Sequence, residues 1–131
     1  MKKYIFLLLI VIIFLQSFKL ANSLISNEEK FFLRVSEKYD AVLYEKWKNS
    51  IDLKNRLIKE IKNKNMNEEY KEYMIKNKNN RLLRLKRKYL KKLNNSLENK
   101  NIIKIKRYLN LILNIFNEEN ENLKNNFQID L

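Results

Sequence analysis

The pattern that decides the fold lies in residues 26–61, which read SNEEKFFLRVSEKYDAVLYEKWKNSIDLKNRLIKEI. Apolar side chains recur there at steps of mostly three or four residues, the spacing that gathers them on one face of an α-helix. They are Phe32, Val35, Tyr39, Val42/Leu43, Trp47, Ile51, Leu57/Ile58 and Ile61. Ser26 and Glu29 have the spacing of a capping box at the helix start. The sequence therefore predicts one helix from residue 27 to about residue 62, roughly 50 Å long.

A polar run at residues 62–67 predicts the end of this helix. Asn65 or Asn67 can cap a second helix, which begins with two glutamates near the positive end of its dipole. The expected apolar stripe of this helix comprises Tyr70, Tyr73/Met74, Leu82, Leu85, Tyr89 and Leu93. Asparagines interrupt the stripe between residues 77 and 80, so we expect a kink or a second break there.

A third helix is expected after a turn at Asn94-Asn95-Ser96. Its apolar face comprises Ile102, Ile105, Leu109, Ile112 and Phe116. The pattern ends in an acidic group, and we expect residues 122–131 to form a frayed C-terminal tail.

These segments predict an all-α fold, with three amphipathic helices in an elongated hairpin or a small bundle. A single helical domain would cover residues 24–121. One layer of long helices buries little apolar surface, so we expect a homodimer that packs along the apolar stripes.

The composition excludes many kinds of site, because the 131 residues include no Gly, Pro, Cys or His. Without Cys and His there is no thiol nucleophile, no Ser-His-Asp triad, no thiolate or imidazole metal site and no disulfide. Without Gly there is no phosphate-binding loop of the usual kind. We therefore expect no enzyme activity and no catalytic, cofactor-binding or metal-binding residues.

Eight of the 15 acidic side chains form three groups, of which two lie at predicted helix starts, where negative charge interacts favourably with the helix dipole. General acid–base catalysis or binding of a hard cation is the alternative use of such groups. The third group, Glu118, Glu119 and Glu121, lies near a predicted helix end and gains nothing from the dipole. We expect it to pair with the basic ridge of residues 81–92, either within the chain or across a dimer.

The first 23 residues have the layout of a secretory signal peptide. Met1-Lys2-Lys3 is positively charged, and a run of twelve apolar residues follows from Tyr4 to Leu15. Ala21 and Ser23 are small residues that fit a cleavage site after Ser23. The apolar run is shorter than the roughly 20 residues that a bilayer span needs, which favours a cleaved signal peptide. The alternative is an N-terminal anchor that is not cleaved. We expect an exported protein of the periplasm, or a secreted one.

The formal net charge is +13, and nine basic but no acidic residues lie between positions 73 and 97. Arg81, Arg84 and Lys88 recur at i, i+3 and i+7, which places them in one ridge on a helix. Lys92 extends this ridge, and apolar side chains flank it. The predicted client-binding residues are Arg81, Arg84, Leu85, Lys88, Tyr89 and Lys92.

Such a surface can hold unfolded or acidic protein clients through combined charge and apolar contact. A membrane surface stays open as a partner, because a basic amphipathic helix can lie on anionic lipid. We expect no nucleic-acid binding, because no base-reading motif is present and a secretory signal removes the protein from most nucleic acid. The alternative is that this basic face is only solvated and binds no partner, because an AT-rich genome enriches lysine without any function.

Two stretches resemble the Spy/CpxP-like group of small periplasmic helical proteins. The first is Asn27-Glu28-Glu29 followed by Phe32 and Tyr39, and the second is the run LLRLKRKYLKKL at residues 82–93. The resemblance covers about residues 25–116, although the group's Leu-Thr-x-x-Gln signature is absent. It implies a cradle-like helical dimer, whose basic and apolar concave face holds clients without ATP or takes part in envelope-stress sensing.

We therefore expect an exported, ATP-independent helical binding protein of the chaperone or stress-response kind. The alternative is a secreted helical hairpin of the coiled-coil type, a structural protein or adhesin that self-associates.

Overall fold

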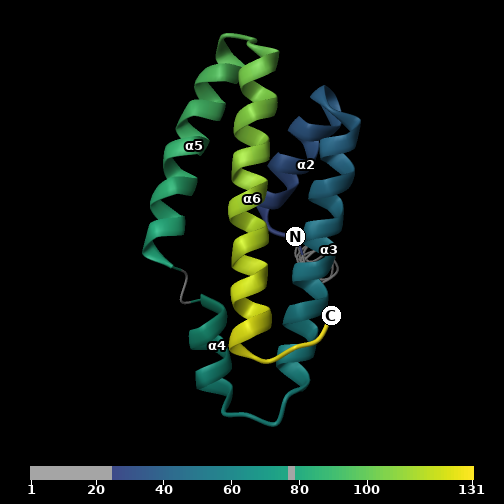
Figure 1. Ribbon diagram of the computed structural model, residues 1–131, viewed down its shortest axis with the longest axis vertical. Coiled ribbons are helices and arrows are strands. Elements are labelled where there is room, and N and C mark those ends of the chain that lie inside the picture. The colour runs from purple at the N-terminus through teal and green to yellow at the C-terminus, as the bar shows by residue number, and fades with distance from the viewer. Residues whose placement is uncertain (1–24, 77–78) are drawn as a thin grey trace, which may run out of the picture.

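The computed structural model describes residues 25–76 and 79–131 (Figure 1). The predicted signal peptide, residues 1–23, lies outside the described residues. The helices are α2 (Asn27–Tyr39), α3 (Ala41–Asn63), α4 (Glu68–Lys76), α5 (Asn80–Glu98) and α6 (Ile102–Asn126). The described residues contain no strand, which confirms the all-α prediction. The prediction of three helices is wrong, because the described part of the chain forms five.

The predicted capping box at the start of α2 is confirmed. Ser26 Oγ accepts a hydrogen bond from the backbone N–H of Glu29 at 3.1 Å, and Glu29 Oε2 accepts one from the backbone N–H of Ser26 at 3.2 Å. The buried Glu29 also forms an ion pair with Lys54 of α3 through its other carboxylate oxygen. One side chain thus begins α2 and joins it to α3.

Asp40 divides the first predicted helix into two. Its backbone is extended (φ −157°, ψ 105°), and its Oδ1 accepts hydrogen bonds of 3.1 Å from the backbone N–H groups of Val42 and Leu43. Asp40 is therefore the N-cap of α3, and α2 folds back along α3 instead of extending it (Figure 1). The prediction of one helix over residues 27–62 is wrong for this reason.

The expected break near residues 77–80 is confirmed, because α4 ends at Lys76 and α5 begins at Asn80. Asn79 caps α5, and its side chain accepts a hydrogen bond of 2.8 Å from the backbone N–H of Arg81. The start of α4 uses Asn67, whose Oδ1 accepts from the backbone N–H of Glu69 at 2.8 Å. Each of these two breaks thus ends at an asparagine, whose side chain accepts a hydrogen bond from a backbone N–H in the first turn of the next helix.

The predicted stripe of the second segment is only partly buried. Leu82 and Leu93 of α5 are buried, whereas Tyr70 and Tyr73 of α4 are exposed. The physical reason is the break itself, because α4 and α5 are separate helices whose apolar faces need not share one direction. In α4 the buried side chain is Lys71, whose Nζ donates to the backbone carbonyl of Lys62 at 3.0 Å.

The turn between α5 and α6 lies later than predicted. Asn94, Asn95 and Ser96 continue α5, because Ser96 is buried and its Oγ donates to the backbone carbonyl of Lys92 at 2.7 Å. The chain turns at residues 99–101, where Lys100 adopts a left-handed backbone conformation (φ 54°). Glycine usually occupies such a position, and this chain contains none.

The main core lies where α6 crosses the other helices. The rings of Phe32 and Trp47 stack at a centroid distance of 4.7 Å, and the Phe116 ring of α6 lies 5.6 Å from Trp47. Other buried members of this cluster are Leu43, Ile51, Leu93, Ile105, Leu109, Ile112 and Leu113. α6 packs against each of the other four described helices and forms the central element of the bundle (Figure 1).

The expected frayed tail at residues 122–131 is wrong. α6 continues to Asn126, and the chain then crosses toward α3 (Figure 1). Phe127 and Ile129 are buried there in a second cluster with Leu57 and Ile61 of α3. Burial of two large apolar side chains holds the end of the chain on the bundle, so the helical body extends past residue 121.

A single chain therefore forms its own core. The expected dimer rests on one layer of helices that buries little apolar surface, and the burial of Phe32, Trp47 and Phe116 within one chain removes that reason. The homodimer stays a prediction. Among the described helices, none combines the length and the apolar character that a bilayer span requires.

Candidate functional site

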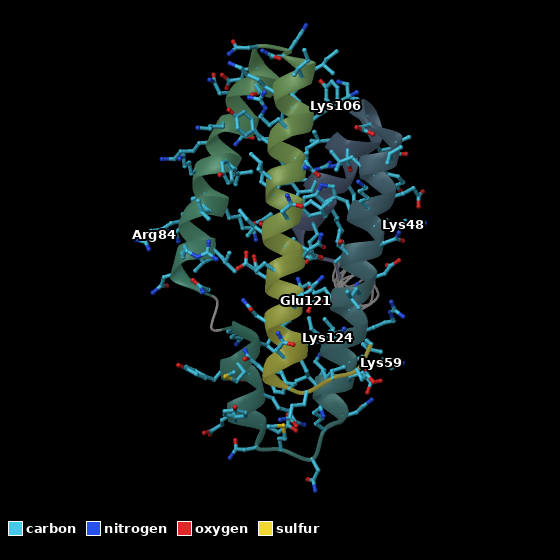
Figure 2. All side chains as sticks on the ribbon, in the orientation of Figure 1. Lys48, Lys59, Arg84, Lys106, Glu121 and Lys124 are labelled. Atoms are coloured by element: carbon cyan, nitrogen blue, oxygen red, sulfur yellow. The ribbon has the colours of Figure 1, made fainter. Side chains whose placement is uncertain are left out.

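α5 carries the predicted client-binding residues at one edge of the bundle (Figure 1). It packs along α6 with Leu82, Leu93 and Ser96 buried. The opposite face of α5 points away from the core, and Figure 2 shows Arg84 projecting from it. The helix is positioned by its cap at Asn79 and by its apolar contact with α6, so its outward direction follows from packing.

Two basic side chains of α5 are paired within the chain. Arg81 donates to Glu118 Oε1 of α6 at 2.8 Å. Lys86 Nζ lies 2.7 Å from Glu28 Oε1 of α2 and 3.8 Å from Glu119 Oε1 of α6. The prediction that the acidic group near residue 118 pairs with the basic segment is thus confirmed within the chain. Arg81 therefore contributes to the attachment of α5 to α6.

The apolar members of the predicted site are partly buried. Leu85 and Tyr89 are half-buried, and the Tyr89 ring stacks on Tyr108 of α6 at a centroid distance of 6.3 Å. Lys92 is exposed, and its Nζ lies 5.8 Å from the centre of the Tyr108 ring. The solvent-facing members of the predicted site are therefore its cations.

The structure adds two residues to the predicted ridge. Arg87 and Lys91 are exposed beside Arg84, Lys88 and Lys92, and all five side chains line one shallow depression. We call these five residues the basic α5 face. Arg87 and Lys91 lie in the same acid-free run of the sequence, but a single i, i+3, i+7 ridge leaves them out. The acid-free run was the signal that could have identified them.

No carboxylate within the described ranges forms an ion pair with Arg84, Arg87, Lys88 or Lys91. Five positive charges thus share a short helical surface and raise the positive potential over it. The other side of the bundle differs. There Figure 2 shows Lys48 and Lys59 of α3. The exposed Glu45, Asp52 and Glu60 lie among the basic residues of this helix.

The bundle also holds a cavity of about 60 Å³ that is lined by side chains of α3, α4, α5 and α6. Ile58, Met74, Leu123 and Asn120 are among the side chains that line it. This volume holds about two to four water molecules and is far smaller than a pocket for a drug-sized ligand. Within residues 25–76 and 79–131, no three acidic side chains gather where they could hold a metal ion.

Comparison of the chain with protein-family models, with curated proteins and with solved structures finds no match.

Proposed function

We propose that the protein is an exported helical binding protein that holds acidic segments of other proteins, unfolded ones included, on the basic α5 face. Binding requires neither ATP nor a cofactor, because charge attraction supplies the free energy. The observation that carries this proposal is the set of exposed cations on α5 that have no carboxylate partner in the described part of the chain.

Acidic protein suits this face better than a lipid surface does. A helix that lies on a membrane must bury its own apolar side in the lipid. The apolar side of α5 already packs on α6, where Leu82 and Leu93 are buried and Tyr89 stacks on Tyr108. A partner that binds through carboxylates alone needs no exposed apolar side chain.

The shape of the surface also suits an extended segment. The five cations follow one helix over about two turns, and the depression between them is shallow and open. Long lysine and arginine side chains can adjust to carboxylates at various spacings, which favours partners that share charge rather than a fixed sequence. This is the property expected of a chaperone-like protein, the function that the resemblance also implies.

The first test follows the aggregation of a reduced, unfolding acidic model protein by light scattering, without ATP. Residues 24–131 should suppress aggregation at equimolar ratio or below in about 0.05 M salt and lose most of this effect in about 0.5 M salt, because salt screens exposed charges. No suppression in either salt would overturn the chaperone function. Long filaments of the protein alone would instead favour the self-associating hairpin.

A further inference from the structure

One end of the bundle exposes three branched apolar side chains. Ile102 and Ile103 open α6 and are 51% and 75% exposed, and Val42 in the first turn of α3 is 67% exposed. Both helix starts lie at the same end of the molecule, because the α2–α3 junction and the α5–α6 turn share that end (Figure 1). We call Ile102, Ile103 and Val42 the apolar tip.

Ile102 and Ile103 are not part of the buried core. The buried side of α6 begins at Ile105 and continues through Leu109 and Ile112. The start of α6 is already capped by Asn101, whose side chain accepts a hydrogen bond of 3.2 Å from the backbone N–H of Lys104. Neighbouring exposed isoleucines at a turn are unfavourable in water, so their burial against a partner would release free energy.

Cations surround the isoleucines. Lys100, Lys104, Lys106 and Arg107 are exposed, and Figure 2 shows Lys106 at this end of the bundle. Lys91 and Lys92 in the later turns of α5 add two more positive charges. Residues 91–107 contain a single acidic residue, Glu98. The apolar tip thus lies beside a strongly positive surface.

This combination matches the surface of an anionic lipid bilayer. Apolar side chains can enter the headgroup region while nearby lysines and arginines attract the lipid phosphates, and each such cation strengthens binding about fivefold. A second copy of the chain fits less well, because its own cations would face those of the first. We propose that this end of the bundle binds reversibly to an anionic lipid bilayer, with Ile102 and Ile103 inserted at the interface. This inference does not depend on the proposed client binding by the basic α5 face.

The absence of cysteine allows a local test on the full chain. Ile103→Cys and Met66→Cys variants are each labelled with a dye whose emission shifts to the blue in apolar surroundings. Met66 is the matched control, because it is also an exposed apolar residue (38%) but lies in the α3–α4 loop at the opposite end (Figure 1). Vesicles contain either phosphatidylcholine alone or a mixture with phosphatidylglycerol.

We expect a blue shift at position 103 with the anionic vesicles and none at position 66. Ile102→Ser in the labelled position-103 chain should weaken vesicle binding at least about fivefold, as should about 0.5 M salt. Equal shifts at positions 66 and 103, or equal shifts with neutral and anionic vesicles, would overturn the proposal. A shift at position 103 that grows with protein concentration without vesicles would also overturn it and identify a second copy as the occupant.

Discussion

Reversal of two charges on the basic α5 face, Arg84→Glu with Lys88→Glu, should weaken binding of an acidic client at least about fivefold. An exposed ion pair contributes about 0.2–1 kcal/mol, and a reversed charge adds a repulsion of similar size. Two reversals therefore remove at least about 1 kcal/mol of binding free energy, which corresponds to this factor. The measurement is the amount of protein needed to halve the light scattering of an aggregating acidic client.

The chain offers a matched control for this pair. Lys48→Glu with Lys59→Glu changes the net charge by the same amount, and both lysines are exposed on the opposite side of the bundle (Figure 2). We expect the control pair to weaken client binding by much less, because Asp52 lies between these positions and Glu45 and Glu60 lie close to them. An equal loss in both pairs would show that net charge alone governs binding and would contradict a specific surface on α5.

Trp47→Ala should have the largest effect on stability. Trp47 is fully buried between Phe32 of α2 and Phe116 of α6, so its removal leaves a cavity that three helices share. Replacement of a buried tryptophan by alanine costs about 3–5 kcal/mol, against a total free energy of unfolding of about 5–15 kcal/mol for a typical domain. Urea unfolding of residues 24–131, followed by circular dichroism, measures the loss.

Two further variants test whether the loss of stability comes from the missing core side chain or follows any substitution in helix α3. Lys48→Ala changes the neighbouring exposed residue and should alter the free energy of unfolding by less than about 0.5 kcal/mol. Trp47→Phe keeps a ring in the core and removes an Nε1–H that has no acceptor among the described residues, so it should lose less than Trp47→Ala. A loss below about 1 kcal/mol for Trp47→Ala would contradict the assigned core.

Helical spacing predicted most of the large buried side chains of α2, α3 and α6, although Val42 and Ile102 of the predicted stripes are exposed. Phe32, Trp47 and Ile51 are buried as the stripe of residues 26–61 requires, and so are Ile105 and Phe116. Spacing succeeds here because one face of each helix must leave water, whatever the partner. The spacing does not reveal where a helix ends and the chain changes direction, because tertiary contacts determine how successive helices are oriented.

Two boundaries were predicted wrongly, the break at Asp40 and the turn between α5 and α6. The apolar steps continue across Asp40, so periodicity could not show that α2 folds back along α3. Asn94, Asn95 and Ser96 favour a turn by residue type, yet burial of Ser96 and its bond to the carbonyl of Lys92 keep them helical. At Asp40 the signal was a local cap that the apolar periodicity hid, whereas at residues 94–96 the tertiary burial of Ser96 outweighed the local turn preference.

The candidate site was predicted by its charge and not by its apolar part. The acid-free run from residue 73 to residue 97 identified α5, and a helical ridge identified Arg84 and Lys88. Its apolar flank is less available, because Tyr89 packs against the core and stacks on Tyr108 of α6, and Leu85 is half-buried. An amphipathic helix seen in isolation does not show which of its residues remain available to a partner.

Binding of acidic protein segments by the basic α5 face predicts a preference for peptides that carry carboxylates. The most direct test is the affinity of residues 24–131 for a dye-labelled, unstructured peptide rich in glutamate, measured by fluorescence anisotropy against the same peptide with glutamine at each glutamate position. The glutamate peptide should bind at least about tenfold more tightly, and this difference should vanish in about 0.5 M salt. Equal affinity for the two peptides in low salt would contradict binding of acidic segments by this face.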